Sequence, residues 1–359
     1  MSLVLQVDGD RWRAHLRATA LRTPGLVPVA KGNGYGFGLA SLARRVQWLA
    51  AQIRPETEDP SLGDTIAVGT YDEVAAVASR CEAAIVVLTP WRPFIALPQS
   101  QSSRLIHTIG RQEDLLALAE LDPHARVVLE RATSMRRHGF DAAGLRHAAR
   151  AARKLSVRVE GVAFHLPLTA GAHLSEVHRL MTDVVAADLA PTTVWVSHLS
   201  PEELATLRAT YADFRIRPRI GTELWLGDRG ALRPRATVLD VHPIDRGELF
   251  GYRGRAAPRA GHLVVVSGGT AHGIGLEAPT GELSFKSRAA SIARGGLDAA
   301  GLVRSPFLID GKQRLFAEPP HMQASMLFLP VGSRVPQVGD RIDVRLRFTA
   351  TTFDRVELS

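Results

Sequence analysis

Apolar and polar residues follow two different spacings along the first two-thirds of the chain. Short apolar, β-branched runs recur, and amphipathic stretches with helical spacing lie between several of them. The expected strands are residues 27–31, 65–69, 84–88, 105–109, 126–130, 159–165, 193–198 and 215–220. The expected helices are residues 39–52, 72–79, 112–120, 142–154, 175–188 and 201–211. Apolar strands that alternate with helices of this length predict βα units and a parallel sheet.

Eight such strands are the number found in a (β/α)8 TIM barrel. The runs 105–109 and 215–220 are the weaker strand predictions, so an open α/β sheet is the alternative. After residue 230, turn residues become frequent and helical spacing nearly disappears, which is typical of an all-β domain. Strand-like runs there are residues 262–269, 305–311, 326–332 and 341–358. The sequence therefore predicts an α/β protein with two domains.

The expected domains are an N-terminal (β/α)8 TIM barrel over residues 1–230 and a C-terminal all-β domain over residues 231–359. The first few residues are candidates to pack on the β domain. With 45% hydrophobic and 22% charged residues, the composition is that of an ordinary globular protein. A single cysteine, Cys81, excludes an internal disulfide and a multi-cysteine zinc site, and the 13 histidines show no metal-ligand spacing.

Charge and hydropathy narrow the expected partners. The net charge of +8 comes from arginines spread along the chain, without the interleaved aromatic residues or the motifs of nucleic-acid-binding proteins. The sequence has no apolar run typical of a secretion signal and none long enough to cross a bilayer. We therefore expect a cytoplasmic protein with a small-molecule substrate and neither nucleic acid nor membrane as a partner.

Lysine is rare in this chain, with only four lysines among 44 basic residues. Lys31 nevertheless ends an apolar run and precedes a glycine-rich segment, residues 32–38. Arginine stays protonated and cannot form a Schiff base, so a lysine kept at this place is a candidate for covalent chemistry. The alternative is an ordinary βα turn beside a lysine that extends to solvent. A second glycine-rich segment, residues 267–275, does not precede an expected helix, which argues against a dinucleotide-binding loop.

Active sites of TIM barrels lie where the strands end. The residues expected there are Lys31, Arg137, His165, Ser197, His198 and Arg219. The loops after strands seven and eight often bind phosphate, which draws attention to Ser197, Ser200, Gly221 and Thr222. A helix cap before Pro201 equally explains Ser200.

The segment Lys31–Gly38 reads K-G-N-G-Y-G-F-G and resembles K-x-N-x-Y-G-x-G, the cofactor-lysine motif of the alanine racemase family of fold-type III enzymes. Residues 129–140, 162–165, 219–227 and 307–326 resemble further segments of that family in the same order. The resemblance implies a barrel joined to a β domain, with pyridoxal 5′-phosphate (PLP) on Lys31 as the Schiff base lysine.

The same resemblance implies roles for other residues. The PLP phosphate is assigned to Tyr35, Ser197, Gly221 and Thr222, with Ser200 as the alternative to Ser197. Arg219 is assigned to the pyridine nitrogen, with His165 behind it, and Arg137 to the substrate carboxylate, which suits a bidentate guanidinium. Glu130 stands where the family has a carbamylated lysine and offers a carboxylate without that modification.

The chain departs from the family pattern at the second base. The family uses a tyrosine in G-Y-A-D-G-Y, contributed by the partner subunit, whereas this chain has Thr270. An aliphatic alcohol is a poor base near neutral pH. His272 titrates in the right range and is the candidate replacement, and a loop histidine with a structural role is the alternative. Gln323 replaces the aspartate of C-M-D, and no counterpart of the family's C-terminal phosphate-tyrosine helix is expected.

Two functions follow as hypotheses. The first is a PLP-dependent amino-acid racemase or epimerase, an isomerase with altered second-base chemistry. The second is a non-catalytic or regulatory PLP-binding homologue. The resemblance also implies a head-to-tail homodimer, in which His272 and His321 lie nearer the partner's Lys31 than their own.

Overall fold

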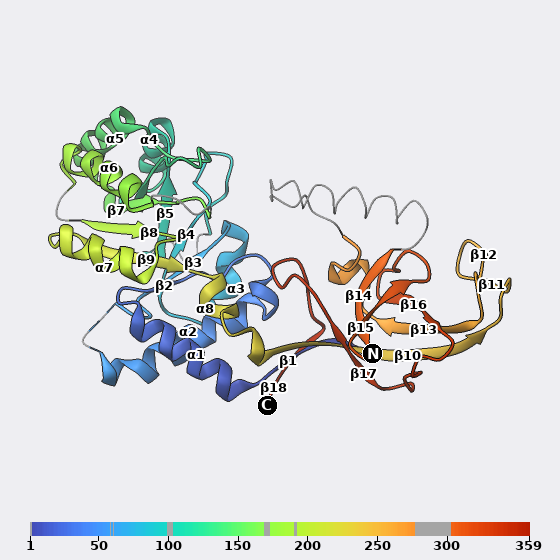
Figure 1. The fold of residues 1–359 in the computed structure, drawn as a ribbon. Coiled ribbons are helices and arrows are strands. Elements are labelled where there is room, and N and C mark those ends of the chain that lie inside the picture. Colours follow the sequence, from blue (N-terminus) through green and yellow to red (C-terminus); the bar gives the residue numbers. More distant parts are fainter. Residues whose placement is uncertain are drawn as a thin grey trace. The chain divides into compact units, whose positions relative to one another are not determined.

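The computed structural model describes residues 2–57, 59, 61–98, 103–168, 173–189, 192–276 and 303–359, which form two compact units (Figure 1). The first unit consists of Met1–Trp12, Tyr35–Phe37 and Asp228–Ser359. The second unit consists of Arg13–Gly34 and Gly38–Gly227 and contains the barrel.

Eight parallel strands build the barrel unit. They are β2 (Val27–Pro28), β3 (Thr65–Val68), β4 (Ala84–Val87), β5 (Leu105–Ile109), β6 (Arg126–Arg131), β7 (Arg158–Phe164), β8 (Thr193–Val196) and β9 (Arg215–Ile220). Their order in the sheet is β2-β9-β8-β7-β6-β5-β4-β3. A bridge between Val29 and Ala67 joins the two ends of this order, so the sheet closes on itself. The predicted (β/α)8 barrel is confirmed, and the open-sheet alternative is wrong.

Helices alternate with these strands. They are α1 (Gly9–Arg22), α2 (Leu39–Ile53), α3 (Val74–Ala78), α4 (Gln112–Leu121), α5 (Ala142–Lys154), α6 (His173–Ala186), α7 (Pro201–Thr210) and α8 (Thr222–Leu226). Among the described residues, no helix combines the length and the hydropathy that a membrane crossing requires. The helix expected at 72–79 is shorter in the structure. A capping box between Thr70 and Glu73 precedes it, and the first residues form a 3-10 turn, Tyr71–Glu73, before α3 begins at Val74.

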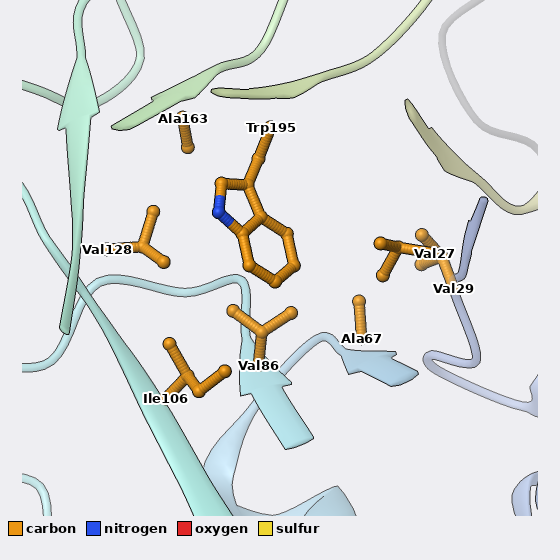
Figure 2. Packing of buried hydrophobic residues seen from close by; sticks show 8 residues of the cluster. All are labelled: Val27, Val29, Ala67, Val86, Ile106, Val128, Ala163 and Trp195. Carbon is orange, nitrogen blue, oxygen red and sulfur yellow. The ribbon is translucent and has the colours of Figure 1, made fainter. Parts of the chain in front are cut away.

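One layer of buried side chains in the barrel comes from seven strands or their ends. Trp195 of β8 points into this layer and is surrounded by small and β-branched side chains (Figure 2). The buried members are Val27, Val29, Ala67, Val86, Ile106, Val128, Ala163 and Trp195. Because the interior is packed with side chains, chemistry is confined to the ends of the strands.

The first unit is a β structure whose strands pair antiparallel, except for the parallel pair β1 and β18. Its main sheet has the order β13-β16-β15-β14-β17-β10-β1-β18. These strands are β1 (Leu3–Val7), β10 (Leu232–Ile244), β13 (Gly261–Ser267), β14 (Arg304–Ile309), β15 (Lys312–Phe316), β16 (Ala324–Pro330), β17 (Arg341–Val344) and β18 (Arg355–Leu358). β1 pairs with β10 and β18, so the first residues of the chain belong to this sheet. A two-stranded ribbon adds β11 (Leu249–Phe250) and β12 (Arg255–Ala256).

The strand-like run at 341–358 is divided in the structure. It forms β17 and β18, and the residues between them bury Phe348 and Phe353 in place of continuing the ladder. The second-domain prediction is confirmed as an all-β architecture, with strands β10 and β15 that the hydrophobic pattern did not reveal.

Candidate active site

Lys31 follows β2 directly. Its backbone carbonyl accepts a hydrogen bond from the Gly34 N–H at 3.1 Å, which begins the glycine-rich turn. A Cβ added to Gly69, at the end of β3, would stand 3.2 Å from the Lys31 Cβ, so the glycine leaves room for the lysine stem. Desolvation lowers the pKa of Lys31, and the cations Arg137 and Arg219 lower it further. This environment favours the neutral, nucleophilic amine.

The Glu73 carboxylate connects the loops that follow β2 and β3. Oε1 accepts a hydrogen bond from the Gly32 N–H at 2.7 Å, and Oε2 accepts one from the Gly69 N–H at 2.6 Å. Its charge opposes the fall in the pKa of Lys31. Glu73 therefore fixes the turn that carries Lys31 and partly balances its cationic neighbours.

Replacing Glu73 with glutamine should lower the pKa of Lys31 further, because a carboxylate that raises this pKa loses its charge. The pH midpoint for acetylation of Lys31, followed by peptide mass spectrometry, should move to lower pH. Asp72→Asn, a change of the exposed neighbouring carboxylate, is the matched control and should leave the midpoint in place. A midpoint that stays fixed or rises in Glu73→Gln would contradict this electrostatic role.

A second group of charges lies at the ends of β6 and β9. Glu130 and Arg219 are buried, and Arg219 Nη2 donates to the Phe164 carbonyl at 2.9 Å. Burial raises the pKa of the Glu130 carboxyl, and Arg219 and Arg137 oppose that rise. Arg219 Nε is buried and has no hydrogen-bond partner among the described residues. A buried donor without a partner is available to an acceptor on a bound ligand or to water.

Backbone hydrogen bonds hold the segment that carries Arg137. The segment leaves β6 and returns to it, because the Phe140 N–H donates to the Glu130 carbonyl at 2.8 Å. Thr133 Oγ1 donates to the His165 carbonyl at 2.6 Å and ties the segment to the strand end at β7. Arg137 itself is exposed and influences the pKa of Lys31. An exposed guanidinium beside the lysine is available to a ligand carboxylate.

Two histidines meet at the ends of β7 and β8. Ser197 Oγ and His165 Nδ1 are 2.9 Å apart, and the His165 and His198 rings are tilted with centroids 5.1 Å apart. Desolvation, followed by the nearby cations Arg219 and Arg137, lowers the pKa of His165 to about 3. His165 is therefore a neutral imidazole over the whole physiological range.

The other residues predicted to bind the phosphate are Ser200, Gly221, Thr222 and Tyr35. Ser200 caps α7 and accepts a hydrogen bond from the Glu203 N–H at 3.2 Å, so helix capping accounts for this residue. Gly221 and Thr222 follow β9, at the strand end where Arg219 lies. Tyr35 is buried and groups with the first unit. The phosphate contacts of Tyr35, Gly221 and Thr222 stay predictions.

His272 lies in the first unit, inside the Gly268–Ile274 turn. Gly269 N–H donates to His272 Nδ1 at 3.2 Å, and His272 Nε2 pairs with Asp354 Oδ1 at 3.1 Å. The other Asp354 oxygen accepts a hydrogen bond from the Leu3 N–H at 2.7 Å. The ring is buried, and both of its nitrogens have partners within the unit. These contacts favour the structural alternative for His272, and its catalytic role stays a prediction.

Asp354→Ala should therefore lower the free energy of unfolding by about 1–2 kcal/mol, because a strand N–H and an imidazole lose their acceptor. Urea unfolding of the full chain measures this loss. Asp343→Ala is the matched control, since its exposed ion pair with Arg235 should contribute at most about 1 kcal/mol. Equal, small losses in the two variants would mean that the His272–Asp354 contact does not anchor the turn.

Sequence reasoning assigned no role to two residues of this site. Glu73 was detectable, because Thr70 and Glu73 have the spacing of a capping box and follow an expected strand. His198 was placed at a strand end, but its φ of 64° was not predictable, because histidine adopts the left-handed region only occasionally.

Lys31, Glu130, Arg137, His165 and Arg219 form the cluster of ionisable residues at the strand ends of the barrel. The model of the alanine racemase N-terminal domain matches residues 7–197, more than half of the 359 residues. The chain belongs to the alanine racemase family. No curated protein sequence matches it.

Solved structures of the family share the architecture over nearly the whole chain. Alanine racemase from Bartonella henselae, described with covalently bound pyridoxal phosphate, is 16% identical, covers 100% of both chains and has a TM-score of 0.69. Alanine racemase from E. faecalis is 20% identical, with a TM-score of 0.66 over 99% of this chain and 98% of that one. Histidine racemase from Leuconostoc mesenteroides subsp. sake is 16% identical, with a TM-score of 0.66 over 99% and 97%. At these identities the likeness supports the fold alone. The chemistry of this member of the alanine racemase family has to be inferred from its own site residues.

Proposed function

We propose that this protein binds pyridoxal 5′-phosphate on Lys31 and catalyses proton transfer at the α-carbon of an amino acid, as a racemase-like isomerase. The observation that carries the proposal is the setting of Lys31: a lysine with a lowered pKa, in the family's cofactor-lysine motif, beside two arginines at the barrel mouth.

The described residues fit this cofactor. Arg219 Nε is a buried donor without a partner, and a pyridine nitrogen is an acceptor that would satisfy it. The positive charges of Lys31, Arg137 and Arg219 suit a ligand with a phosphate and a carboxylate. Membership of the alanine racemase family and the PLP described in the Bartonella henselae enzyme support the same cofactor.

When bound, pyridoxal phosphate supplies an electron sink that acidifies the α-proton of an attached amino acid. The Lys31 amine accepts that proton on one face, because its lowered pKa keeps a neutral fraction available. Arg137 binds the substrate carboxylate and orients the α-carbon. Arg219 holds the pyridine nitrogen by donation and, being protonated, keeps that nitrogen free of its own proton. The Glu130 carboxylate stabilises the positive charges of the two arginines.

The two candidate functions differ in whether a second base serves the face of the α-carbon opposite Lys31. Thr270 replaces a basic group, and His272 is engaged with Asp354, which favours either one-face proton exchange or a binding-only protein. The lowered pKa of Lys31 suits both candidate functions, because attachment of an aldehyde and acceptance of a proton both require the neutral amine. The substrate is a small amino acid, and the expected location is the cytoplasm.

We also propose a head-to-tail homodimer, in which each β unit approaches the barrel mouth of its partner. Sedimentation at micromolar concentration should give a dimer, and chemical cross-links from His321 or Met322 should reach the barrel mouth of the other chain. Mixing isotopically labelled and unlabelled chains identifies intermolecular links. A monomer, or a dimer joined through barrel helices alone, would contradict this arrangement.

Titration of the purified protein with PLP tests the cofactor proposal. The wild-type protein should acquire a visible absorbance band at one equivalent that resists dialysis. Lys154→Arg, which changes an unrelated lysine on α5, should give the same band. A wild-type protein that stays colourless and retains no PLP would overturn the proposal.

A further inference from the structure

His198 occupies a strained position two residues after β8. Its φ is 64°, in the left-handed region that residues other than glycine adopt uncommonly. Such outliers persist where the surroundings hold them, and they concentrate at functional sites. The loop after this seventh barrel strand is also where many barrels bind phosphate.

A hydrogen bond fixes the tautomer of this histidine. His198 Nδ1 lies 2.6 Å from the Leu166 carbonyl oxygen, which can only accept, so Nδ1 carries the hydrogen. In the neutral ring, Nε2 then holds a lone pair. The His198 side chain is exposed, and no hydrogen bond to its ring other than that with Leu166 is seen among the described residues. Nε2 is thus an acceptor open to a ligand.

The titratable groups around His198 come from four elements. Lys31 follows β2, Arg219 ends β9, His173 begins α6 and His165 follows β7. Desolvation lowers the pKa of His198, the bond to Leu166 opposes this, and Arg219, Lys31 and His173 lower it further. His173 Nε2 is itself buried without a partner in the part of the chain that the structure describes. The ring is therefore neutral at pH 7 before any anion binds.

We propose that His198 is a proton-linked contact for the phosphate of the bound cofactor: Nε2 takes up one proton from solvent when the phosphate binds. The inference rests on the proposed cofactor. A phosphate dianion has only acceptor oxygens, so it can pair with Nε2 only if a proton lies between them. Nδ1 keeps its hydrogen and continues to donate it to the Leu166 carbonyl, so the imidazolium carries one positive charge against the two negative charges of the phosphate. The anion offsets the repulsion from Lys31 and Arg219 that keeps the free ring neutral.

Calorimetry with pyridoxine 5′-phosphate tests this linkage, because that ligand has the phosphate but cannot react with Lys31. Titrations in two buffers of different ionisation enthalpy, at pH 7.5, count the protons taken up. Wild-type protein should take up about one proton more than His198→Asn, and its affinity should fall up to about tenfold more between pH 7 and pH 8. Asparagine tolerates the left-handed conformation but cannot be protonated. His147→Asn, on the exposed face of α5, is the matched control and should behave as wild type.

Two further arms separate the possible failures. With pyridoxine, which lacks the phosphate, wild type and His198→Asn should take up the same number of protons. If they differed as much as with pyridoxine 5′-phosphate, the proton uptake would depend on the pyridine ring of the ligand, and the proposal would be overturned. In the wild-type protein, ¹⁵N NMR should show His198 Nε2 changing from an unprotonated to a protonated nitrogen on binding. Binding of PLP with Nε2 still unprotonated would overturn the His198 proposal and leave the cofactor proposal standing. Failure to bind either phosphate ligand would overturn both.

Discussion

Replacing Lys31 with arginine should abolish covalent retention of PLP and lower α-proton exchange of amino acids by roughly 10²–10⁴-fold or more. Arginine keeps the positive charge and much of the side-chain length, so the barrel mouth and its anion attraction persist. It stays protonated, however, and can neither attach to an aldehyde nor accept a proton. Absorbance after dialysis measures retention, and deuterium incorporation from heavy water measures exchange.

Lys312→Arg, on β15 of the other unit, is the control for a general effect of losing a lysine. It should retain PLP and exchange activity at the wild-type level. Lys286 lies outside the described residues, and its replacement serves as a second control for attachment. If the Lys31→Arg protein kept dialysis-resistant, aldehyde-derived absorbance, another residue would be the attachment point.

The second large effect concerns stereochemistry. Interconversion of alanine enantiomers should be slower by roughly 10²–10⁴-fold than with a base on each face, because Thr270 cannot accept a proton near neutral pH. Lys31 still serves its own face. In heavy water, one enantiomer should therefore exchange its α-proton and keep its configuration, as judged by NMR and chiral chromatography.

Each outcome of that experiment has a distinct meaning. Lys31→Arg is the negative control and should exchange neither enantiomer. If the wild-type protein also exchanged neither enantiomer, the result would favour the non-catalytic PLP-binding homologue over the enzyme. Rapid interconversion of both enantiomers would contradict the prediction about Thr270 and show that another group serves the second face.

The barrel could be predicted from sequence because its strands are short, buried and separated by amphipathic helices. The runs at 105–109 and 215–220 were the weaker predictions, yet they form β5 and β9 with the expected bounds. In β9 three arginines interrupt the apolar pattern, and two of them, Arg217 and Arg219, are buried. Arg217 is buried because Asp64 pairs with it at 2.6 Å, a contact from a distant loop that no local pattern reveals.

The site was predictable to the extent that its residues end barrel strands. Lys31, Glu130, Arg137, His165 and Arg219 influence one another's pKa values in the structure, as strand-end positions imply. The partners of His272 could not be foreseen, since Asp354 lies 82 residues away and the fold alone brings them together. The carboxylate of Glu73 likewise reaches a glycine 41 residues earlier in the chain.

Reduction of the PLP-loaded protein with borohydride, followed by peptide mapping, tests the central claim most directly. Borohydride converts the attachment into a stable adduct whose mass locates it on one lysine. The described barrel predicts that this adduct lies on Lys31 alone, at one equivalent per chain. An adduct on Lys154, Lys286 or Lys312, with Lys31 unmodified, would contradict the account.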